Sequence, residues 1–240
     1  MQLREQVGVG VGCKNYFIRS DFSTRGNQSK FLAAPHTIIA SNTSGLSLTE
    51  MASGIKREDQ AIIAHWWNPP HITPVVEVVK GRSTSGKTLD LVCQLLVSIG
   101  KKPVKILKEV PGFLGNRLQF ALYREALYCL KEGIASAGDI DMAVKGTFGF
   151  RLPTLGPLET SDLGGLDTFL SIAEYLFKEI DRSTEAPEIL REKVRQGKLG
   201  VKAGEGFFRY TPEEAAKKIK ERDRQFLRRL KCLYFTDSGK

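Results

Sequence analysis

Short apolar runs alternate with longer amphipathic stretches over the first half of the chain. The apolar runs are rich in isoleucine, valine and alanine and are bounded by turn residues, which is typical of buried strands. Two stretches between them have the spacing and the serine caps of helices. Helices that alternate with apolar strands indicate parallel βαβ units. Strands are predicted at 37–40, 61–64, 74–79 and 104–107, and helices at 46–55 and 84–99.

The pattern changes after Pro111-Gly112, beyond which apolar residues recur only at helical spacing. Residues 1–30 show no clear period. We therefore predict an α/β domain over residues 1–108 and an all-helical domain over residues 109–240. The later helices are expected at 116–131, 137–145, 166–180, 187–196 and 212–234.

Composition narrows the classes of partner. The chain of 240 residues carries 36 basic and 27 acidic side chains, a net charge of +9. Much of the excess lies between residues 217 and 231, where interleaved acids at helical spacing indicate a solvated helix face. No uncharged apolar run approaches the roughly 20 residues of a membrane helix. We expect neither nucleic acid nor a membrane as a partner.

The four cysteines, at positions 13, 93, 129 and 232, stand far apart and have no neighbouring histidine. This spacing predicts neither a zinc site nor a redox motif. Reduced, buried thiols in a cytoplasmic protein are the expected state.

Two glycine-containing segments raise the alternative of nucleotide binding. The residues from Gly81 to Thr88 satisfy the P-loop pattern G-x-x-x-x-G-K-[ST] and lie between a predicted strand and a predicted helix. No later strand ending in a metal-binding aspartate follows, so a helix cap is the simpler interpretation. Glycines 8, 10 and 12 approach the dinucleotide fingerprint but lack its third glycine.

Among the candidate residues, the pair best suited to acid–base chemistry is His65 with Glu77. His65 stands at the carboxyl end of a predicted strand, where open α/β sheets place ligands, and Glu77 lies in the next strand. A carboxylate on one imidazole nitrogen fixes the tautomer and leaves the other nitrogen free to accept a substrate proton. His71 could join His65 on a metal, but no third ligand has a usual spacing, so no metal is expected.

Two further segments stand where strand ends pass into helices: residues 41–44, Ser-Asn-Thr-Ser, and residues 111–117, Pro-Gly-Phe-Leu-Gly-Asn-Arg. Their hydroxyl and amide groups could bind a substrate oxygen, and either segment alone could equally be a helix cap.

Taken together, these segments resemble the 3-hydroxyacyl-CoA dehydrogenase family. The resemblance runs in order from about residue 31 to 210. It is carried by residues 38–46, 65–79, 111–119, 156–167 and 197–208. It implies a Rossmann-like parallel sheet, in this chain a partial one that lacks the first strands, followed by an all-α domain.

The resemblance also implies roles for individual residues. His65 takes the proton of the substrate 3-hydroxyl, and Glu77 orients it. Ser44 and Asn116 hold the substrate oxygens, while Asn68, with Ser44, lies at the cofactor NAD. Hydride would pass from the substrate to NAD⁺ in β-oxidation of fatty acids.

The resemblance leaves the substrate open. With Trp66 and Trp67, the segment differs from the Phe-Phe-Asn-Pro-Val form of the short-chain CoA enzymes. The double proline at 69–70 is similar to that of the gulonate dehydrogenase branch, which acts on free 3-hydroxy acids. A homodimer through the helical domain is the expected assembly.

The family places several strand–helix units before the strand predicted at 37–40, whereas 36 residues precede it here. We therefore expect an N-terminally truncated cofactor domain with weak NAD affinity. A non-catalytic dimerisation remnant remains an alternative.

Overall fold

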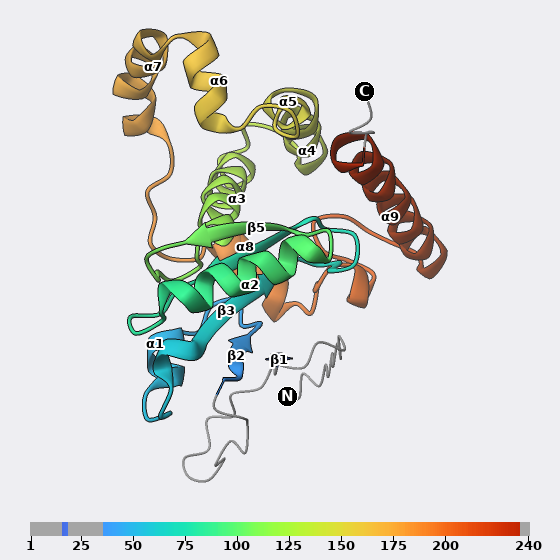
Figure 1. Cartoon of the computed structure of the whole chain (residues 1–240). Coiled ribbons are helices and arrows are strands. Elements are labelled where there is room, and N and C mark those ends of the chain that lie inside the picture. Colours follow the sequence, from blue (N-terminus) through green and yellow to red (C-terminus); the bar gives the residue numbers. More distant parts are fainter. Residues whose placement is uncertain (1–15, 19–35, 236–240) are drawn as a thin grey trace. The chain divides into compact units, whose positions relative to one another are not determined.

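The computed structural model describes residues 16–18 and 36–235, and these residues divide into two compact units after Leu118 (Figure 1). The glycine segment at 8–12 lies outside the described residues. The first unit is built on a sheet and the second is helical, as the sequence predicts.

The first unit contains a five-stranded sheet with its strands in chain order, β1-β2-β3-β4-β5. The first strand lies in the region where the sequence shows no period, and it pairs parallel to the second. The other four strands coincide closely with the predicted ones. The strands are β1 Tyr16–Ile18, β2 Ile38–Ser41, β3 Ala61–Trp66, β4 Val75–Val79 and β5 Lys102–Ile106.

The parallel pairing expected from the βαβ pattern is found in the sheet at every pair of strands but one, β3 and β4. β2 pairs parallel to β3 and β4 pairs parallel to β5, but β3 and β4 are antiparallel. The two parallel connections pass through helices, whereas residues 67–74 are too few for the crossover that a parallel pair requires. The short connection therefore reverses the chain, and it sets His65 directly opposite Glu77 in the register.

The core lies on both faces of β3 and β4. On one face the side chains of Ile62 and Val78 pack against α2, Gly86–Ser98, which runs along the sheet in Figure 1. On the other face Ile63 and Val79 pack against the buried residues of α1, Leu48–Ala52. Because side chains alternate along a strand, His65 and Glu77 point to the α1 face, at the end of the buried rows.

The side chains of the P-loop-like segment cap α2 and bind backbone carbonyl groups. Ser85 caps α2 by accepting a hydrogen bond from the amide of Thr88, at 3.1 Å. The buried hydroxyls of Thr84 and Thr88 donate to the carbonyl oxygens of Ala61 and Asp59, at 2.7 and 2.8 Å. Hydroxyls engaged in this way are not offered to phosphate or magnesium, so the structure favours the helix cap over the P-loop.

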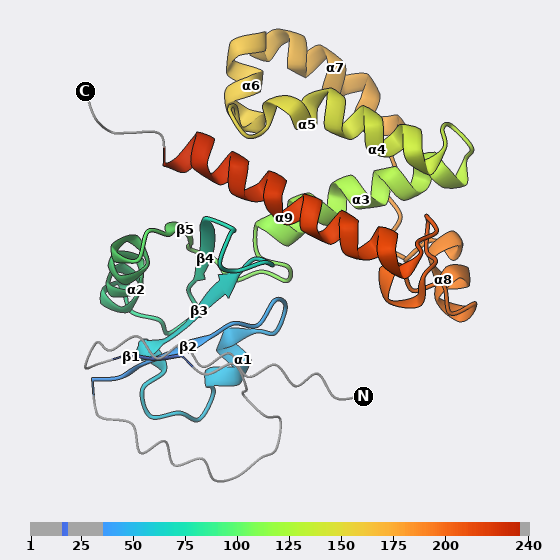
Figure 2. The ribbon, with the colours of Figure 1, turned by 90° about the vertical axis from the view of Figure 1, so that its right-hand side faces the viewer.

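The second unit follows the predicted helices and adds two short ones, α5 and α6. Helices α6 and α7 lie side by side in both views (Figures 1 and 2). In the described part of this unit, Leu127 is the one buried hydrophobic side chain. Among the helices described, none is both long enough and apolar enough to cross a bilayer. The helices are α3 Gly115–Lys131, which begins in the first unit, α4 Ala137–Gly146, α5 Phe148–Arg151, α6 Pro157–Gly164, α7 Leu166–Glu179, α8 Glu188–Arg195 and α9 Pro212–Tyr234, with 3₁₀ turns at η1 Glu58–Gln60 and η2 Val201–Ala203.

Candidate active site

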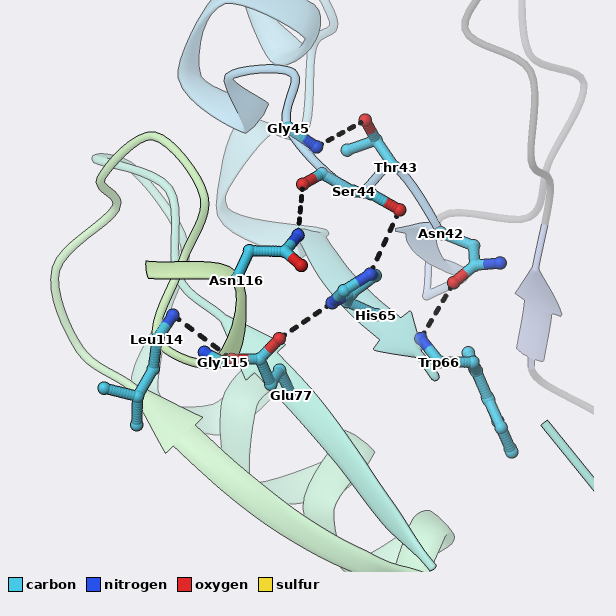
Figure 3. A network of polar contacts seen from close by, with 10 residues as sticks. All are labelled: Asn42, Thr43, Ser44, Gly45, His65, Trp66, Glu77, Leu114, Gly115 and Asn116. Carbon is cyan, nitrogen blue, oxygen red and sulfur yellow. Dashed lines mark hydrogen bonds and ion pairs between the residues drawn. The ribbon is translucent and has the colours of Figure 1, made fainter. Parts of the chain in front are cut away.

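A buried imidazole–carboxylate pair forms the centre of the site (Figure 3). Nδ1 of His65 lies 2.7 Å from Oε2 of Glu77, and the two residues are only 4% and 2% exposed. The register between β3 and β4 produces this contact, because residues directly opposite in an antiparallel pair project from the same face.

The second oxygen of Glu77 is held by the backbone at the start of α3. Oε1 accepts hydrogen bonds from the amides of Gly115 at 2.8 Å and Leu114 at 3.2 Å. Burial by itself raises the pKa of Glu77, but the hydrogen bonds from His65 and from the two amides outweigh it, so this pKa lies below its ordinary value. Glu77 is therefore ionised at neutral pH. Because a carboxylate only accepts, Nδ1 of His65 donates, and in the neutral ring Nε2 keeps its lone pair.

Ser44 stands at this remaining nitrogen. Its hydroxyl oxygen lies 3.0 Å from Nε2 of His65, and the serine is exposed, unlike the pair behind it. The side-chain amide of Asn116 donates to the carbonyl oxygen of Ser44 at 3.2 Å, which ties the segment after β2 to the start of α3. A turn positions the serine, since the hydroxyl of Thr43 accepts from the amide of Leu46 at 3.0 Å.

Aromatic rings flank the imidazole on two sides. The Trp67 ring centre lies 5.3 Å from that of His65, and the buried Phe113 meets the imidazole edge-on at 5.5 Å. The indole also lies against the backbone of Gly115, where an added Cβ would come within 2.3 Å of Trp67 Cζ2. Glycine at this position therefore does two things, because its amide binds Glu77 and its missing side chain leaves room for the indole.

The structure brings four of the five predicted site residues together: Ser44, His65, Glu77 and Asn116. Asn68 is exposed in the loop after β3, and within the described chain it makes no hydrogen bond to those four. None of the described residues forms a group of three histidine, cysteine, aspartate or glutamate side chains that could hold a metal.

Sequence reasoning missed several contributors. Asn42 accepts from the amide of Trp66 at 2.9 Å and so joins the ends of β2 and β3. The amides of Leu114 and Gly115 and the two aromatic rings were also missed. The glycine within Phe-Leu-Gly-Asn-Arg was the available signal for these contacts, because a glycine often marks a place where another group lies close to the backbone.

The packing of Trp67 on Gly115 leads to a first prediction. Gly115→Ala should lower the free energy of unfolding by about 1–3 kcal/mol, since the new methyl group displaces the indole. Adding Trp67→Phe should recover most of this loss, because a phenyl ring lacks the outer edge that clashes. Urea unfolding of both single variants and of the double variant measures the coupling. A double variant no more stable than Gly115→Ala alone contradicts the packing argument.

The second prediction concerns acid. Because folding lowers the pKa of Glu77, its ionisation stabilises the protein fully above the ordinary value of 4.5, and this stabilisation is lost as the pH falls through the lowered pKa. Stability measured by urea unfolding should therefore decline more steeply below pH 4.5 in the wild type than in Glu77→Gln. Glu58→Gln, at an exposed carboxylate on Ser83, should keep the wild-type slope. Equal slopes in all three proteins would contradict this prediction.

Comparisons with known proteins match two family models to this chain. Residues 27–110 match the model of the 3-hydroxyacyl-CoA dehydrogenase NAD binding domain, and residues 112–210 match that of the 3-hydroxyacyl-CoA dehydrogenase C-terminal domain. The first match contains Ser44, His65 and Glu77, and the second contains Asn116.

Individual relatives give the same family. A probable 3-hydroxybutyryl-CoA dehydrogenase of Deinococcus radiodurans is 36% identical over 82% of this chain and 69% of its own length. The 5-formyl-3-hydroxy-2-methylpyridine 4-carboxylate 5-dehydrogenase of Mesorhizobium japonicum is 36% identical over 82% of this chain. The chain spans 63% of the length of that protein.

The fold is shared as well. A solved structure of a 5-dehydrogenase of the same pyridine compound, described as an NAD⁺ dependent dismutase, has a TM-score of 0.82 and 35% identity, and the match covers 84% of this chain and 65% of the other. By its sequence and its structure, the chain belongs to the 3-hydroxyacyl-CoA dehydrogenase family.

Proposed function

We propose that this chain carries the proton-transfer machinery of an NAD-dependent oxidation of a 3-hydroxyacyl-CoA to the 3-ketoacyl-CoA. The observation that carries the proposal is the line of contacts from exposed Ser44 through His65 to buried Glu77 (Figure 3). Its inner end is an ionised carboxylate, and its outer end is an imidazole nitrogen with a hydroxyl beside it.

Oxidation of an alcohol removes a hydride from carbon and a proton from oxygen. Nε2 of His65 accepts the hydroxyl proton, and Glu77 stabilises the imidazolium that forms. The hydroxyl of Ser44 and the amide of Asn116 hydrogen-bond the substrate oxygens. Bound NAD⁺ supplies the hydride acceptor, and the protein contributes position and charge.

Two described asparagines fit the cofactor. Asn42 and Asn68 are exposed and follow the carboxyl ends of β2 and β3, the edge at which open α/β sheets bind dinucleotides. The side-chain oxygen of Asn42 accepts a hydrogen bond from the amide of Trp66. The NH₂ group of Asn42 is then left to donate to a carboxamide or a ribose hydroxyl. Asn68, with Ser44, remains our proposed contact to the nicotinamide side.

A second candidate substrate carries no CoA and is either a free 3-hydroxy acid or an alcohol on an aromatic ring. It is favoured by the aromatic rings around His65 and by the TM-score of 0.82 to the pyridine-compound dehydrogenase. Assays with acetoacetyl-CoA, with free 3-hydroxy acids and with a pyridine methanol separate these substrates.

A third prediction tests the base. With NADH and acetoacetyl-CoA, His65→Gln should lower turnover by about 100- to 10,000-fold, because the general acid–base group is lost. His71→Gln is the matched control, since His71 is exposed and lies in the loop that follows β3. Full turnover by His65→Gln would refute the assignment. A wild-type chain that turns over none of the substrates would leave the non-catalytic alternative.

We also propose that the helical unit forms a homodimer. It exposes large apolar side chains, among them Phe150, Leu158 and Leu163, at 80%, 78% and 74%. Apolar surface of this extent marks an interaction site in a soluble protein.

The fourth prediction is therefore a mass by light scattering of twice the 26.7 kDa chain. Phe177→Lys, at an exposed position of α7, should shift the mass toward one chain, because the cation must be desolvated in an apolar interface. Glu174→Lys, on the same helix and also exposed, should leave the dimer intact. A wild-type mass of one chain would refute the dimer.

A further inference from the structure

Glu109 lies outside the residues that touch the imidazole, yet it joins the two segments that do. It follows β5 and stands six positions before Gly115 in the chain. Its carboxylate reaches across to the start of α1, which stands four positions after Ser44. One side chain therefore connects the segment that holds Glu77 with the segment that presents Ser44.

The contact to α1 is made by several hydrogen bonds. The amide of Leu48 donates to Oε1 of Glu109, and the hydroxyl of Thr49 donates to Oε2 at 2.5 Å. The amide of Thr49 also lies 3.3 Å from Oε2. The amide of the next residue, Glu50, donates to the capping serine, Ser47. The first amides of α1 therefore find two different acceptors. Those of Leu48 and Thr49 donate to Glu109, and that of Glu50 donates to Ser47.

The segment that follows Glu109 is fixed by a turn and by one buried side chain, Phe113. The amide of Phe113 closes a turn on the carbonyl oxygen of Val110 at 3.0 Å, and Phe113 adopts a φ of 51° while almost fully buried. Its ring packs in the same core as Leu48. A non-glycine residue holds this left-handed conformation only where its surroundings fix it.

These contacts form a closed circuit of residues, here called the ring, that includes the imidazole of His65. From Glu109 the ring passes to the start of α1, back along the chain to Ser44, through His65 to Glu77, and through the amide of Gly115 back to Glu109. The bond from Asn116 to the carbonyl oxygen of Ser44 spans the same ring. Without Glu109, the ring would be held on that side by Asn116 and by apolar packing.

We infer that Glu109 is a positioning residue: by tying the first amides of α1 to the segment before α3, it fixes Ser44 and the Gly115 amide at the two ends of the His65–Glu77 pair. The inference rests on the proposed function for its kinetic consequence, but its structural consequence needs neither substrate nor cofactor. The hydrogen-bonded Nδ1 proton of His65 and the amide proton of Gly115 report the geometry directly.

The fifth prediction compares Glu109→Ala and Glu109→Gln with Glu58→Gln in the full chain. In Glu109→Ala, the Gly115 amide should exchange with solvent about tenfold faster than in the wild type, relative to the core amides of β3, and the low-field NMR signal of the His65 Nδ1 proton should broaden or vanish. Glu109→Gln keeps an acceptor oxygen and should show a smaller change. Glu58→Gln, whose carboxylate contacts Ser83, should match the wild type.

The kinetic readout separates positioning from stability alone. With substrate and NADH, kcat of Glu109→Ala should fall about 10- to 100-fold with a smaller change in KM, because misplaced catalytic groups lose transition-state contacts first. If Glu109→Ala is less stable but keeps both proton signals, its role is purely structural and the inference fails. If it does not fold, the decision rests on Glu109→Gln, whose unchanged signals would likewise refute the inference. If the wild-type chain shows both proton signals but no turnover, the proposed activity is refuted. The positioning role of Glu109 is then decided by the NMR comparison of the variants.

Discussion

The hydrogen bond between His65 and Glu77 is the contact on which the rest of the site depends. A carboxylate that is 2% exposed would be costly to bury as an ion without donors. Three donors meet it here: the imidazole Nδ1–H and the amides of Gly115 and Leu114. The antiparallel register supplies the first donor and the start of α3 supplies the other two. The tautomer of His65 is therefore a consequence of how the sheet and the start of α3 are joined.

The positions of the central strands and most helices could be predicted from sequence because each buries a simple periodic pattern. The direction of β4 does not follow from its apolar pattern, since the pattern of an apolar strand is the same in either direction. The deciding quantity was the length of the connection at 67–74, which is too short for a crossover. That length was visible in the sequence, but the alternation of strands and helices elsewhere favoured a uniform parallel sheet.

The side chains of the site were easier to predict than its backbone. Ser44, His65, Glu77 and Asn116 carry chemistry that a motif can show, and the structure brings them together. The amides that hold Glu77 have no side-chain signature, because any residue but proline provides one. The P-loop-like segment shows the converse. Thr88 fills a specified position of the motif and Thr84 lies within it, yet the hydroxyls of both bind the backbone of their own unit.

The buried charged pair and most of the exposed apolar side chains lie in different parts of this chain. Every polar contact to the imidazole and its carboxylate comes from residues between 44 and 115, within the first compact unit. The large exposed apolar side chains gather instead in the helical unit, where Leu127 is the one hydrophobic side chain buried among the described residues. A unit that satisfies its own buried charge needs no partner to fix the tautomer of His65. A unit that leaves its apolar side chains in water gains stability when another surface covers them. Substitutions in the two units should therefore affect different properties.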